Sequence, residues 1–310
     1  MAESVRVFAP ATVANVAAGF DILGFAVNEP GDEVILRKTD SRVTTISRIT
    51  GDGGRLPTAS EKNTAGISVV KFLDHLGIDQ GIDIELHKKM PLGSGMGSSA
   101  ASAVASVYAA NILLDEPLTP LELLPFALEG EAMACGTGHA DNAAPSLLGG
   151  FILIRSYNPL DVVPIATPEN LFCTLMHPQI EVLTDDARKI LRKNILLKDA
   201  ITQWGNVAGL IAGLINSDYD LISRSMQDVI IEPVRSLLIP GYDSIKDAAM
   251  EAGAMGCSIS GSGPSLFALS TSMDTARAAG AAMQEACNEI EIESELYISP
   301  INKSGPRVLN

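Results

Sequence analysis

The stretch PLGSGMGSSAA, residues 91–101, combines alternating glycines with a pair of serines and contains no lysine. Glycines at 93, 95 and 97 permit backbone conformations with positive φ, which let a chain approach a phosphate group closely. Ser98 and Ser99 stand where a helix would begin, so they can cap it and offer hydroxyls to a phosphate or a metal ion. Such a helix start holds anions with its free N–H groups and its dipole, without a cationic side chain. The stretch therefore predicts a phosphate-binding loop.

Two better-known phosphate-binding fingerprints do not fit this loop. The Walker A motif requires a lysine directly after its last glycine, and here Gly97 is followed by serine. The dinucleotide fingerprint requires G-x-G-x-x-G, whereas the spacing here is G-x-G-x-G. It also needs an acidic residue at the end of the next strand, but Asp115 stands in the turn-forming stretch DEPLTP. The competing interpretation is a tight structural turn before a packed helix.

A second stretch, EGEAMACGTGHADNAAPSLLGG, concentrates acidic and amide side chains. Within fourteen residues it contains Glu129, Glu131, His139, Asp141 and Asn142. A carboxylate near the phosphates of a nucleotide suits Mg²⁺, which takes oxygen ligands and keeps several waters. A zinc site is not indicated, because no second histidine or cysteine stands at ligand spacing. A single histidine such as His139 more often has a structural hydrogen-bonding role.

Two further segments carry polar residues or glycines in apolar surroundings. In PATVANVAAGFD, residues 10–21, Asn15 and Asp21 either form turns or contact a substrate, since buried polar groups need partners. In GCSISGSGPSLFAL, Gly261 and Gly263 predict a strand that is interrupted by a bulge or a turn.

The composition narrows the class of protein. The 310 residues are 46% hydrophobic and carry a formal net charge of −15, which argues against a nucleic-acid partner because phosphate-backbone binding needs a basic patch. Cys135, Cys173, Cys257 and Cys287 form no CxxC pair and are interpreted as buried thiols. The first residues show no signal peptide, and the uncharged stretch 92–114 is rich in glycine, serine and alanine rather than leucine. We expect a cytoplasmic protein that does not contact a membrane.

Hydrophobic periodicity predicts a mixture of strands and helices, and hence an α+β or α/β fold. Strands are predicted over residues 5–12, 32–39, 43–50, 82–90, 151–157, 172–178, 256–270 and 293–301, with 32–39 and 43–50 paired to each other. Helices are predicted over residues 63–77, 98–114, 121–136, 195–215, 221–229, 242–252 and 273–287, with a further one starting at Asp185. The proline-rich stretch 158–170 is the candidate boundary between two domains.

The segments that carry chemistry, in this order, resemble the GHMP kinases, a family of small-molecule kinases. Residues 91–100 match the family's lysine-free P-x-x-x-G-L/M-G-S-S-A loop, and SISGSGPSLFAL matches its third motif. PATVANVAAGFD resembles P-A-T-x-A-N-x-G-x-G-F-D of the family's homoserine kinases and departs from it at Ala17, where that pattern has glycine. HADNAAP, IEPVR and DDARKIL are also similar to segments of that branch. The resemblance covers nearly the whole chain.

The resemblance implies a two-domain α+β fold. Residues 1–157 would form an N-terminal α+β nucleotide-binding domain and residues 158–310 a C-terminal ferredoxin-like α/β sandwich, with the active site in the cleft between them. It further implies a homodimer that uses ATP and Mg²⁺ to phosphorylate the side-chain hydroxyl of L-homoserine, a step toward threonine.

The resemblance also implies roles for individual residues. The loop would wrap the ATP phosphates with Pro91, Leu92, Gly93, Ser94, Gly95, Met96, Gly97, Ser98, Ser99, Ala100 and Ala101. Glu131 and Ser99, or Ser98 in its place, would hold Mg²⁺. Such a site needs mostly positioning and charge stabilisation, because phosphoryl transfer requires little covalent chemistry from the protein.

Homoserine is a zwitterion, so its site should contain both signs of charge. Asp21 suits the ammonium group, and Arg188 and Arg235 suit the carboxylate, which a guanidinium binds in a bidentate manner. The competing interpretation of each arginine is a charge on a solvent-exposed helix. The remaining implied contacts are Asn15, His139, Asn142 and Gly261, the first three orienting the reacting hydroxyl. We interpret Asp141 as a supporting residue rather than a base, with the hydroxyl proton leaving late.

Three other interpretations stay open at this point. A GHMP kinase of the mevalonate or shikimate type would have no use for Asp21, because its substrate lacks an amino group. A non-catalytic nucleotide-binding relative would be expected to lack the carboxylate or the loop serines, yet Glu131, Ser98 and Ser99 are present. A dinucleotide-binding oxidoreductase is disfavoured by the glycine spacing.

Overall fold

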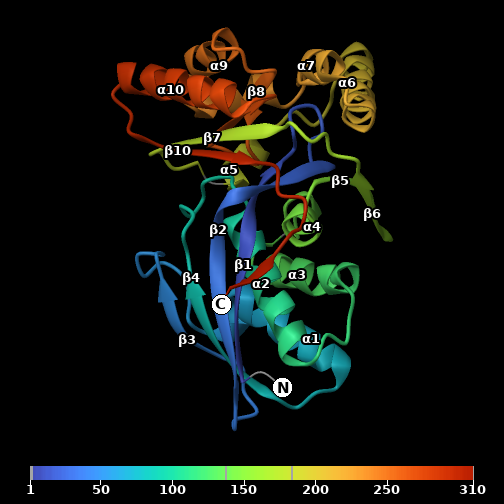
Figure 1. Ribbon diagram of the computed structural model, residues 1–310, viewed down its shortest axis with the longest axis vertical. Helices are drawn as coiled ribbons and strands as arrows, with labels where there is room; N and C mark the ends of the chain where they lie inside the picture. Colours follow the sequence, from blue (N-terminus) through green and yellow to red (C-terminus); the bar gives the residue numbers. More distant parts are fainter. Residues whose placement is uncertain (1–2, 137, 183, 310) are drawn as a thin grey trace.

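The computed structural model describes residues 3–136, 138–182 and 184–309. The chain forms two β-sheets that follow each other along the long axis of the molecule, each covered by helices (Figure 1). The larger sheet has the strand order β11-β1-β2-β4-β3, and β5 and β6 extend from β2. Its strands are β1 (Ser4–Ala14), β2 (Leu23–Thr39), β3 (Thr45–Thr50), β4 (Gly81–His87), β5 (Phe151–Tyr157), β6 (Leu160–Ile165) and β11 (Arg307–Leu309).

The smaller sheet is antiparallel and has the order β10-β7-β9-β8. Its strands are β7 (Phe172–Pro178), β8 (Gly256–Ile259), β9 (Leu266–Ser270) and β10 (Ser294–Pro300). Helices separate β7 from β8 and β9 from β10, while β8 and β9 form a hairpin, which is the βαββαβ arrangement of a ferredoxin-like sandwich. The predicted α+β class and the ferredoxin-like second half are confirmed.

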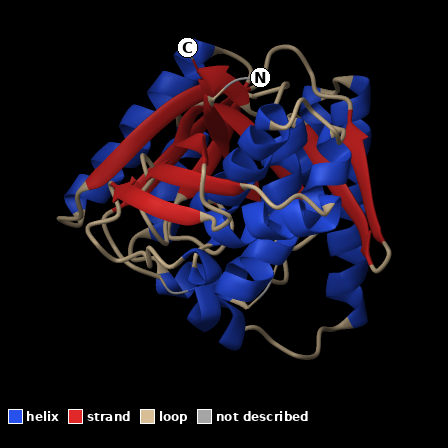
Figure 2. Cartoon of the chain, turned by 90° about the horizontal axis from the view of Figure 1, so that it is seen from below, coloured by secondary structure: helices blue, strands red, loops and turns tan. Residues whose placement is uncertain are grey.

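The helices divide between the two sheets. Helices α1 (Thr64–Leu76), α2 (Ser98–Leu113), α3 (Pro120–Cys135) and α4 (Ala140–Leu148) pack together on the larger sheet, and Figure 2 shows this separation of strands and helices from below. Helices α9 (Tyr242–Glu251) and α10 (Met273–Glu289) cover the smaller sheet. Between β7 and β8 the chain also forms α5 (Thr184–Lys189), α6 (Leu197–Asn216), α7 (Tyr219–Ser225) and α8 (Glu232–Arg235), and short 3₁₀ turns lie at Ser60–Lys62 and Ser236–Leu238.

Local sequence signals account for several helix boundaries. Asn63 caps α1 by accepting a hydrogen bond from the N–H of Ala65, and Gly77 ends that helix in the left-handed conformation. Thr119 and Glu122 form a capping box at the start of α3. The prediction over 221–229 was too long: α7 ends at Ser225, because Asp228 accepts the N–H groups that lead into α8.

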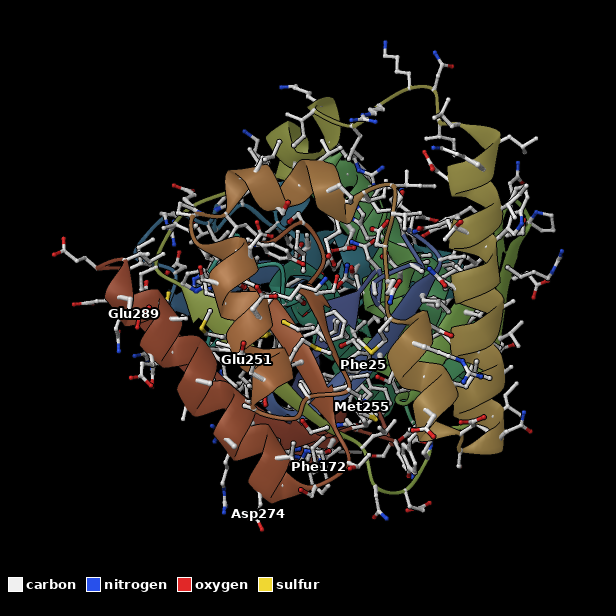
Figure 3. All side chains as sticks on the ribbon, turned by 90° about the horizontal axis from the view of Figure 1, so that it is seen from above. Phe25, Phe172, Glu251, Met255, Asp274 and Glu289 are labelled. Atoms are coloured by element: carbon white, nitrogen blue, oxygen red, sulfur yellow. The ribbon has the colours of Figure 1, made fainter. Side chains whose placement is uncertain are left out.

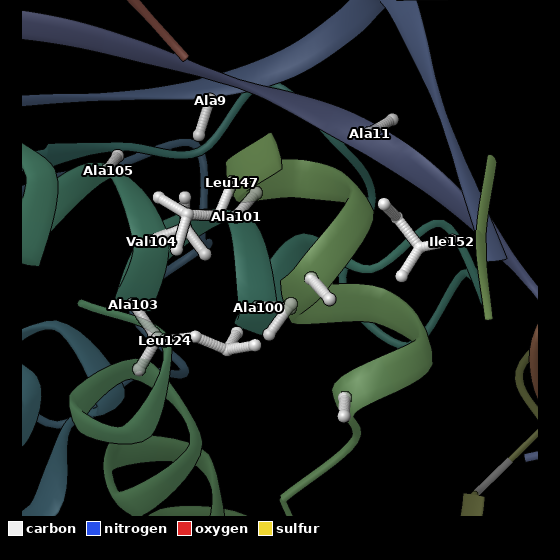
Figure 4. Close-up of a cluster of buried hydrophobic side chains, with 14 of the residues drawn as sticks. Ala9, Ala11, Ala100, Ala101, Ala103, Val104, Ala105, Leu124, Leu147 and Ile152 are labelled. Carbon is white, nitrogen blue, oxygen red and sulfur yellow. The ribbon is translucent and has the colours of Figure 1, made fainter. Parts of the chain in front are cut away.

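The two sheets share a hydrophobic core. Phe25 of β2 stacks on Phe151 of β5 with ring centroids 4.6 Å apart, and Phe267 of β9 approaches Phe25 edge-on at 5.8 Å. Small side chains of α2 fill the space between that helix, α4 and β1 (Figure 4). The alanine-rich stretch after the glycine loop is therefore a buried helix, as predicted. Among the described residues, no helix is both long and apolar enough to cross a membrane.

One predicted strand pairing is wrong. The segments 32–39 and 43–50 are strands, but β4 lies between β2 and β3, and β3 pairs with β4 in parallel. Alternation of apolar and polar residues identifies a half-buried strand without specifying its partner. Here β4 presents its own apolar face to the same core, so it takes the central position.

Two segments beyond residue 157 join the larger sheet. Strand β6 lies inside the proline-rich stretch 158–170 and pairs with β5, and β11 at the end of the chain pairs with β1. The domain division at residues 157 and 158 stays a prediction. Three of the cysteines, Cys173, Cys257 and Cys287, are buried free thiols, whereas the side chain of Cys135 lies outside the described part of the chain.

Candidate active site

The residues identified from the sequence surround a cavity of about 380 Å³. Its walls come from the end of β1, the glycine loop between β4 and α2, the helices α3, α4, α5 and α8, and the turn between β8 and β9. The lining includes Asn15, Asp21, Leu92, Gly93, Ser94, Gly95, Gly97, Ser98, Ser99, Glu131, His139, Asp141, Asn142, Arg188, Arg235 and Gly261. The fold thus gathers residues that are up to 246 positions apart, as in the hydrogen bond from the Asn15 side chain to the carbonyl of Gly261.

The three glycines of the loop have positive φ, at 70° for Gly93, 78° for Gly95 and 70° for Gly97. A Cβ atom at Gly95 would lie 2.3 Å from the carbonyl oxygen of Ser260, and one at Gly97 would lie 2.1 Å from the hydroxyl of Thr12. At Gly93 a Cβ atom would meet open space. Gly93 is therefore required for the conformation alone, whereas Gly95 and Gly97 are required also for close packing.

Hydrogen bonds join the loop to the two other glycine-containing segments. The N–H of Thr12 donates to the carbonyl of Met96 at 3.1 Å, and the N–H of Ser265 donates to the carbonyl of Ser94 at 3.2 Å. The hydroxyl of Ser260 donates to the carbonyl of Gly95 at 2.8 Å. These hydrogen bonds join into one frame the three segments that the sequence marks separately.

The hydroxyl of Ser94 is a good candidate for contact with a phosphate. Ser94 is 1% exposed and lines the cavity, and its Oγ has no hydrogen-bond partner among the described residues. A buried hydroxyl without a partner is costly, so it favours a ligand that supplies one. Beside it, α2 begins with Gly97 as N-cap and without a side-chain cap. Its first N–H groups are available to an anion.

The expected capping role of Ser98 is wrong, because its hydroxyl has another partner. It donates to Oδ2 of Asp32 at 2.8 Å. Asp32 also accepts from the ammonium group of Lys88, which donates to the carbonyl of Ser98 at 2.8 Å and to the hydroxyl of Ser102 at 2.6 Å. Both charged side chains are almost fully buried. Ser98 therefore holds the loop to β2, which leaves Ser99 as the stronger candidate for a metal ligand.

This buried ion pair was missed in the sequence. A signal for it exists, since Asp32 directly precedes Glu33 and Lys88 directly follows His87, and Glu33 and His87 are opposite each other on the antiparallel strands β2 and β4. Lys88 ends the strand that leads into the loop and lines the cavity. The loop itself contains no lysine, but a cation lies directly beneath the start of α2.

Glu131 and Ser99 are adjacent, as a shared metal site would require. Glu131 is 3% exposed and accepts hydrogen bonds from the hydroxyl of Ser99 and, at 3.2 Å, from the N–H of His139. Burial raises the pKa of Glu131 to about 7. In the described part of the chain, no three or more His, Cys, Asp or Glu residues cluster to hold a metal ion. One carboxylate and one hydroxyl suit Mg²⁺, which takes its other ligands from phosphates and water.

Asp141 and Asn142 lie in the first turn of α4, at the wall of the cavity. Asp141 is 2% exposed, and its Oδ1 has no hydrogen-bond partner among the described residues. Burial, and then the charges of Asp21 and Glu131, raise the pKa of Asp141 to about 7, against the weaker opposing effect of Arg188. The carbonyl oxygen of the Asn142 side chain accepts from the hydroxyl of Thr12 at 2.8 Å.

The stability of Asp141→Asn, measured relative to that of the wild type, is expected to be higher at pH 8 than at pH 5. Between pH 4 and 7 the folded state retains a proton on Asp141 that the unfolded state has lost, so the wild-type free energy of unfolding falls as the pH rises. Asparagine does not titrate in this range, so the free energy of unfolding of the variant does not fall for this reason. Urea unfolding at both pH values should show the stability difference shifting by about 2 kcal/mol in favour of the variant. A shift in the opposite direction would contradict the raised pKa.

The loop after β1 has an unusual backbone. Asn15, Val16, Ala17 and Asp21 have φ values of 72°, 41°, 57° and 60°, a region that non-glycine residues rarely adopt. Asn15 holds this conformation by donating to the carbonyl of Gly261 at 2.6 Å and accepting from the N–H of Asp21 at 3.0 Å. Ala17, which stands where the family pattern has glycine, has a left-handed backbone that glycine adopts without strain.

Two arginines approach this loop from the C-terminal half. Arg188 donates to Oδ1 of Asp21 at 2.9 Å. Arg235, which is 4% exposed, donates to the carbonyls of Ala187 at 3.1 Å and Gly261 at 3.0 Å. Both guanidinium groups lie over the ring of Phe20, at 5.7 and 4.8 Å from its centroid. The interpretation of Arg235 as a solvent-exposed helix charge is therefore wrong, and Arg188 is paired and half-buried.

The cavity thus combines a glycine loop at the start of a helix, a carboxylate beside a serine, and an acidic group close to two arginines. Comparison with protein families matches residues 63–150 to the GHMP kinases N terminal domain and residues 210–289 to the GHMP kinases C terminal. The chain belongs to the GHMP kinase family.

Closely similar GHMP kinases are homoserine kinases. The homoserine kinase of Chlorobium phaeovibrioides is 56% identical over 99% of this chain and 100% of its own length, and that of Chloroherpeton thalassium is 54% identical over the same shares. The crystal structure of homoserine kinase from Cytophaga hutchinsonii has a TM-score of 0.98 and 60% identity, covering 100% of this chain and 98% of its own. The GHMP kinase resemblance and its homoserine kinase branch are confirmed.

A few loop residues of this GHMP kinase do not line the cavity with their side chains. Met96, Ala100 and Ala101 are buried in the core, the two alanines among the side chains of Figure 4. Pro91 is half-buried and is not part of the lining. The three buried residues could reach ATP only through their backbone, and the role of all four as ATP contacts stays a prediction.

Proposed function

We propose that this chain transfers the terminal phosphoryl group of ATP to the side-chain hydroxyl of L-homoserine, forming O-phospho-L-homoserine in threonine biosynthesis. The observation that carries the proposal is that the glycine loop, with the pair Ser99 and Glu131, shares one cavity with Asp21, Arg188 and Arg235. ATP use follows from membership of a kinase family. The homoserine kinases that are more than 50% identical support the choice of acceptor.

On the phosphate side, residues 91–101 would surround the ATP phosphates with N–H groups and the hydroxyl of Ser94. Ser99 and Glu131 would hold Mg²⁺, with Ser98 less suited because of its bond to Asp32. When bound, Mg²⁺ would neutralise charge on the β- and γ-phosphates. This assignment is supported by the buried Ser94 hydroxyl without a partner and by the contact between Ser99 and Glu131.

On the acceptor side, Asp21 would bind the ammonium group, while Arg188 and Arg235 would bind the carboxylate. The hydrogen bond between Arg188 and Asp21 supports this, because a zwitterion offers each of them a new partner of opposite charge. The carbonyl of Gly261 accepts from Asn15 and Arg235 and would hold both in place. Burial and the nearby Arg188 lower the pKa of His139, so a neutral imidazole can join Asn15 and Asn142 in orienting the hydroxyl.

The hydroxyl proton would leave late, with Asp141 as a supporting residue. Asp141→Asn is then expected to lower kcat less than about 10⁴-fold, the upper range of general acid–base catalysis. Steady-state kinetics at saturating ATP and L-homoserine measures this. A larger loss with unchanged folding would identify Asp141 as a base and overturn the late-proton proposal.

The activity is tested with an ADP-release assay on L-homoserine, mevalonate, shikimate and galactose. Phosphorylation of L-homoserine is the expected result. ADP release with another acceptor alone would favour a GHMP kinase of a different type. ADP release with none of them, despite nucleotide binding, would favour a non-catalytic relative. A cytoplasmic location and a homodimer accompany this proposal as predictions.

Asp21→Asn is expected to reduce kcat/KM for L-homoserine by about 10- to 100-fold, the effect of losing a hydrogen bond between charged groups. The KM for ATP should change little, because Asp21 faces the acceptor. A matched control is Asp161→Asn on β6, whose carboxylate pairs with Arg155 outside the cavity. An equal loss with a similar acceptor that lacks the amino group would contradict the role of Asp21.

A further inference from the structure

Two side chains outside the cavity hold the loop after β1, residues 15–21. Left-handed backbone is unfavourable for residues other than glycine, so the four such residues of this loop depend on support from the surrounding structure. The carbonyl of Ala18 accepts a hydrogen bond from Gln203 of α6. The carbonyl of Asp21 accepts one from Tyr157 of β5. Neither of these two side chains lines the cavity, so each can affect a bound acceptor only through the residues that it holds.

Gln203 connects the loop to the segment that leads into α8. Helix α6 runs along one edge of the molecule (Figure 3), and its Gln203 is partly buried. The amide nitrogen of Gln203 donates hydrogen bonds at 2.9 Å both to the carbonyl of Ala18 and to Oδ1 of Asp228. The amide oxygen of Gln203 accepts from the N–H of Val229 at 3.0 Å. Asp228 in turn accepts the N–H groups of residues 230–232, which lead into the helix that carries Arg235.

Tyr157 connects the same loop to the start of α4. Its hydroxyl donates to the carbonyl of Asp21 at 2.8 Å, and its oxygen accepts from the backbone N–H groups of Ala140 and Asp141. Burial raises the pKa of this hydroxyl, so it stays protonated and able to donate. The side chain of Tyr157 is half-exposed. Its replacement by phenylalanine therefore removes the hydroxyl without leaving a cavity in the core.

We infer that Gln203 and Tyr157 are positioning residues for the acceptor. The groups that would bind it, on Asp21, Arg235 and Asn142, stand on three separate elements: the loop after β1, α8 and α4. Gln203 joins the loop to α8, and Tyr157 joins the loop to α4. A small acceptor binds more tightly when the groups around it are held in place beforehand. The effect of the two side chains on the acceptor rests on the proposed function.

Gln203→Glu and Tyr157→Phe test the two positions with nearly isosteric changes. Gln203→Glu is expected to lower kcat/KM for L-homoserine about 10- to 100-fold, because the carbonyl of Ala18 loses its donor and a second carboxylate faces Asp228. Tyr157→Phe removes a single hydrogen bond to the loop and should lower kcat/KM about three- to tenfold. Steady-state kinetics should show both losses mainly in the KM for L-homoserine, with the KM for ATP within about twofold of the wild type. Equal changes in the two KM values would overturn the positioning role.

A double variant distinguishes positioning from a general loss of stability. In Asp21→Asn the carboxylate that Tyr157 would position is already absent. Adding Tyr157→Phe to it should therefore lower kcat/KM for L-homoserine by less than about a further twofold. If the effects of the two single variants multiplied in the double variant, Tyr157 would not act through Asp21.

Two matched controls lie away from the cavity. Gln179 and Tyr297 both donate hydrogen bonds to the exposed Glu295. Gln179→Glu and Tyr297→Phe make the same chemical changes as the test variants and should leave the kinetics unchanged. Circular dichroism should show that the variants are folded, and Tyr157→Phe carries the test if Gln203→Glu does not fold. A control that raised the KM for L-homoserine as much as the test variants would overturn the assignment.

Hydrogen exchange followed by mass spectrometry tests the restraint of the loop without using activity. In both single variants, the amides of residues 15–21 should exchange faster than in the wild type, while those of residues 91–101 keep their rates. Unchanged exchange of residues 15–21 would overturn the inference. A wild type that released no ADP with L-homoserine would contradict the proposed function instead, and faster exchange in the variants would still support the restraint.

Discussion

Glu131→Gln is expected to lower kcat about 1,000-fold, because the amide removes the negative charge that would hold Mg²⁺ next to the phosphates. Glutamine has the same shape and can still accept hydrogen bonds from Ser99 and from the N–H of His139. The loss should therefore come from charge rather than from packing. Initial rates measured over a Mg²⁺ titration should also show weaker apparent metal binding.

Glu129→Gln is the matched control for this prediction. Glu129 lies two residues away on α3, is half-exposed, and pairs loosely with Lys71 at 3.9 Å. Its replacement should leave kcat and the Mg²⁺ dependence unchanged. If Glu131→Gln retained kcat within about tenfold of the wild type, the assignment of Glu131 to the metal would be contradicted.

Lys88→Met is expected to destabilise the fold by about 3–5 kcal/mol, since it leaves Asp32 as an unpaired charge in the core. Asp32 is fully buried, and its other partners are the N–H groups of Lys89 and Met90 and the hydroxyl of Ser98. These neutral donors do not replace the ammonium group. Urea unfolding measures the loss of stability.

A second variant and a control test whether the loss of stability comes from the buried ion pair or from any substitution in the residues that follow β4. The double variant K88M/D32N removes both charges and should recover much of the lost stability. Lys89→Met removes a half-exposed lysine that pairs with Glu33 and should cost less than about 1 kcal/mol. Equal destabilisation by Lys88→Met and Lys89→Met would argue against a special role for the buried pair.

Features with a local cause could be predicted from the sequence. Gly77 ends α1 because glycine adopts the left-handed conformation there, and the loop glycines 93, 95 and 97 have the positive φ values that their type suggested. The period of apolar residues identified most strands and helices. These signals depend on residues that are close in the sequence, so they can be recognised without knowing which distant segment packs against them.

Features that depend on distant partners could not be predicted. The alternation in 32–39 and 43–50 gave no indication that β4 separates them, and the short β11 joins β1 only because the chain returns to the first sheet. Ser98 or Ser99 was expected to cap α2, but the N-cap is Gly97, and the hydroxyl of Ser98 donates to Asp32. Which strand pairs with which, and which acceptor a hydroxyl bonds to, depend on the groups that the fold buries together.

The sequence by itself determined the family, and it predicted a phosphate-binding loop and the types of residue that a zwitterionic acceptor would need. Only the tertiary structure decided which of them act together. It set Arg235 over Phe20 and against Gly261, placed Arg188 beside Asp21, and buried Glu131 next to Ser99. The physical reason is that hydrogen-bond pairing and the pKa of a carboxylate depend on burial and on neighbours from distant segments, which residue types and spacing do not specify.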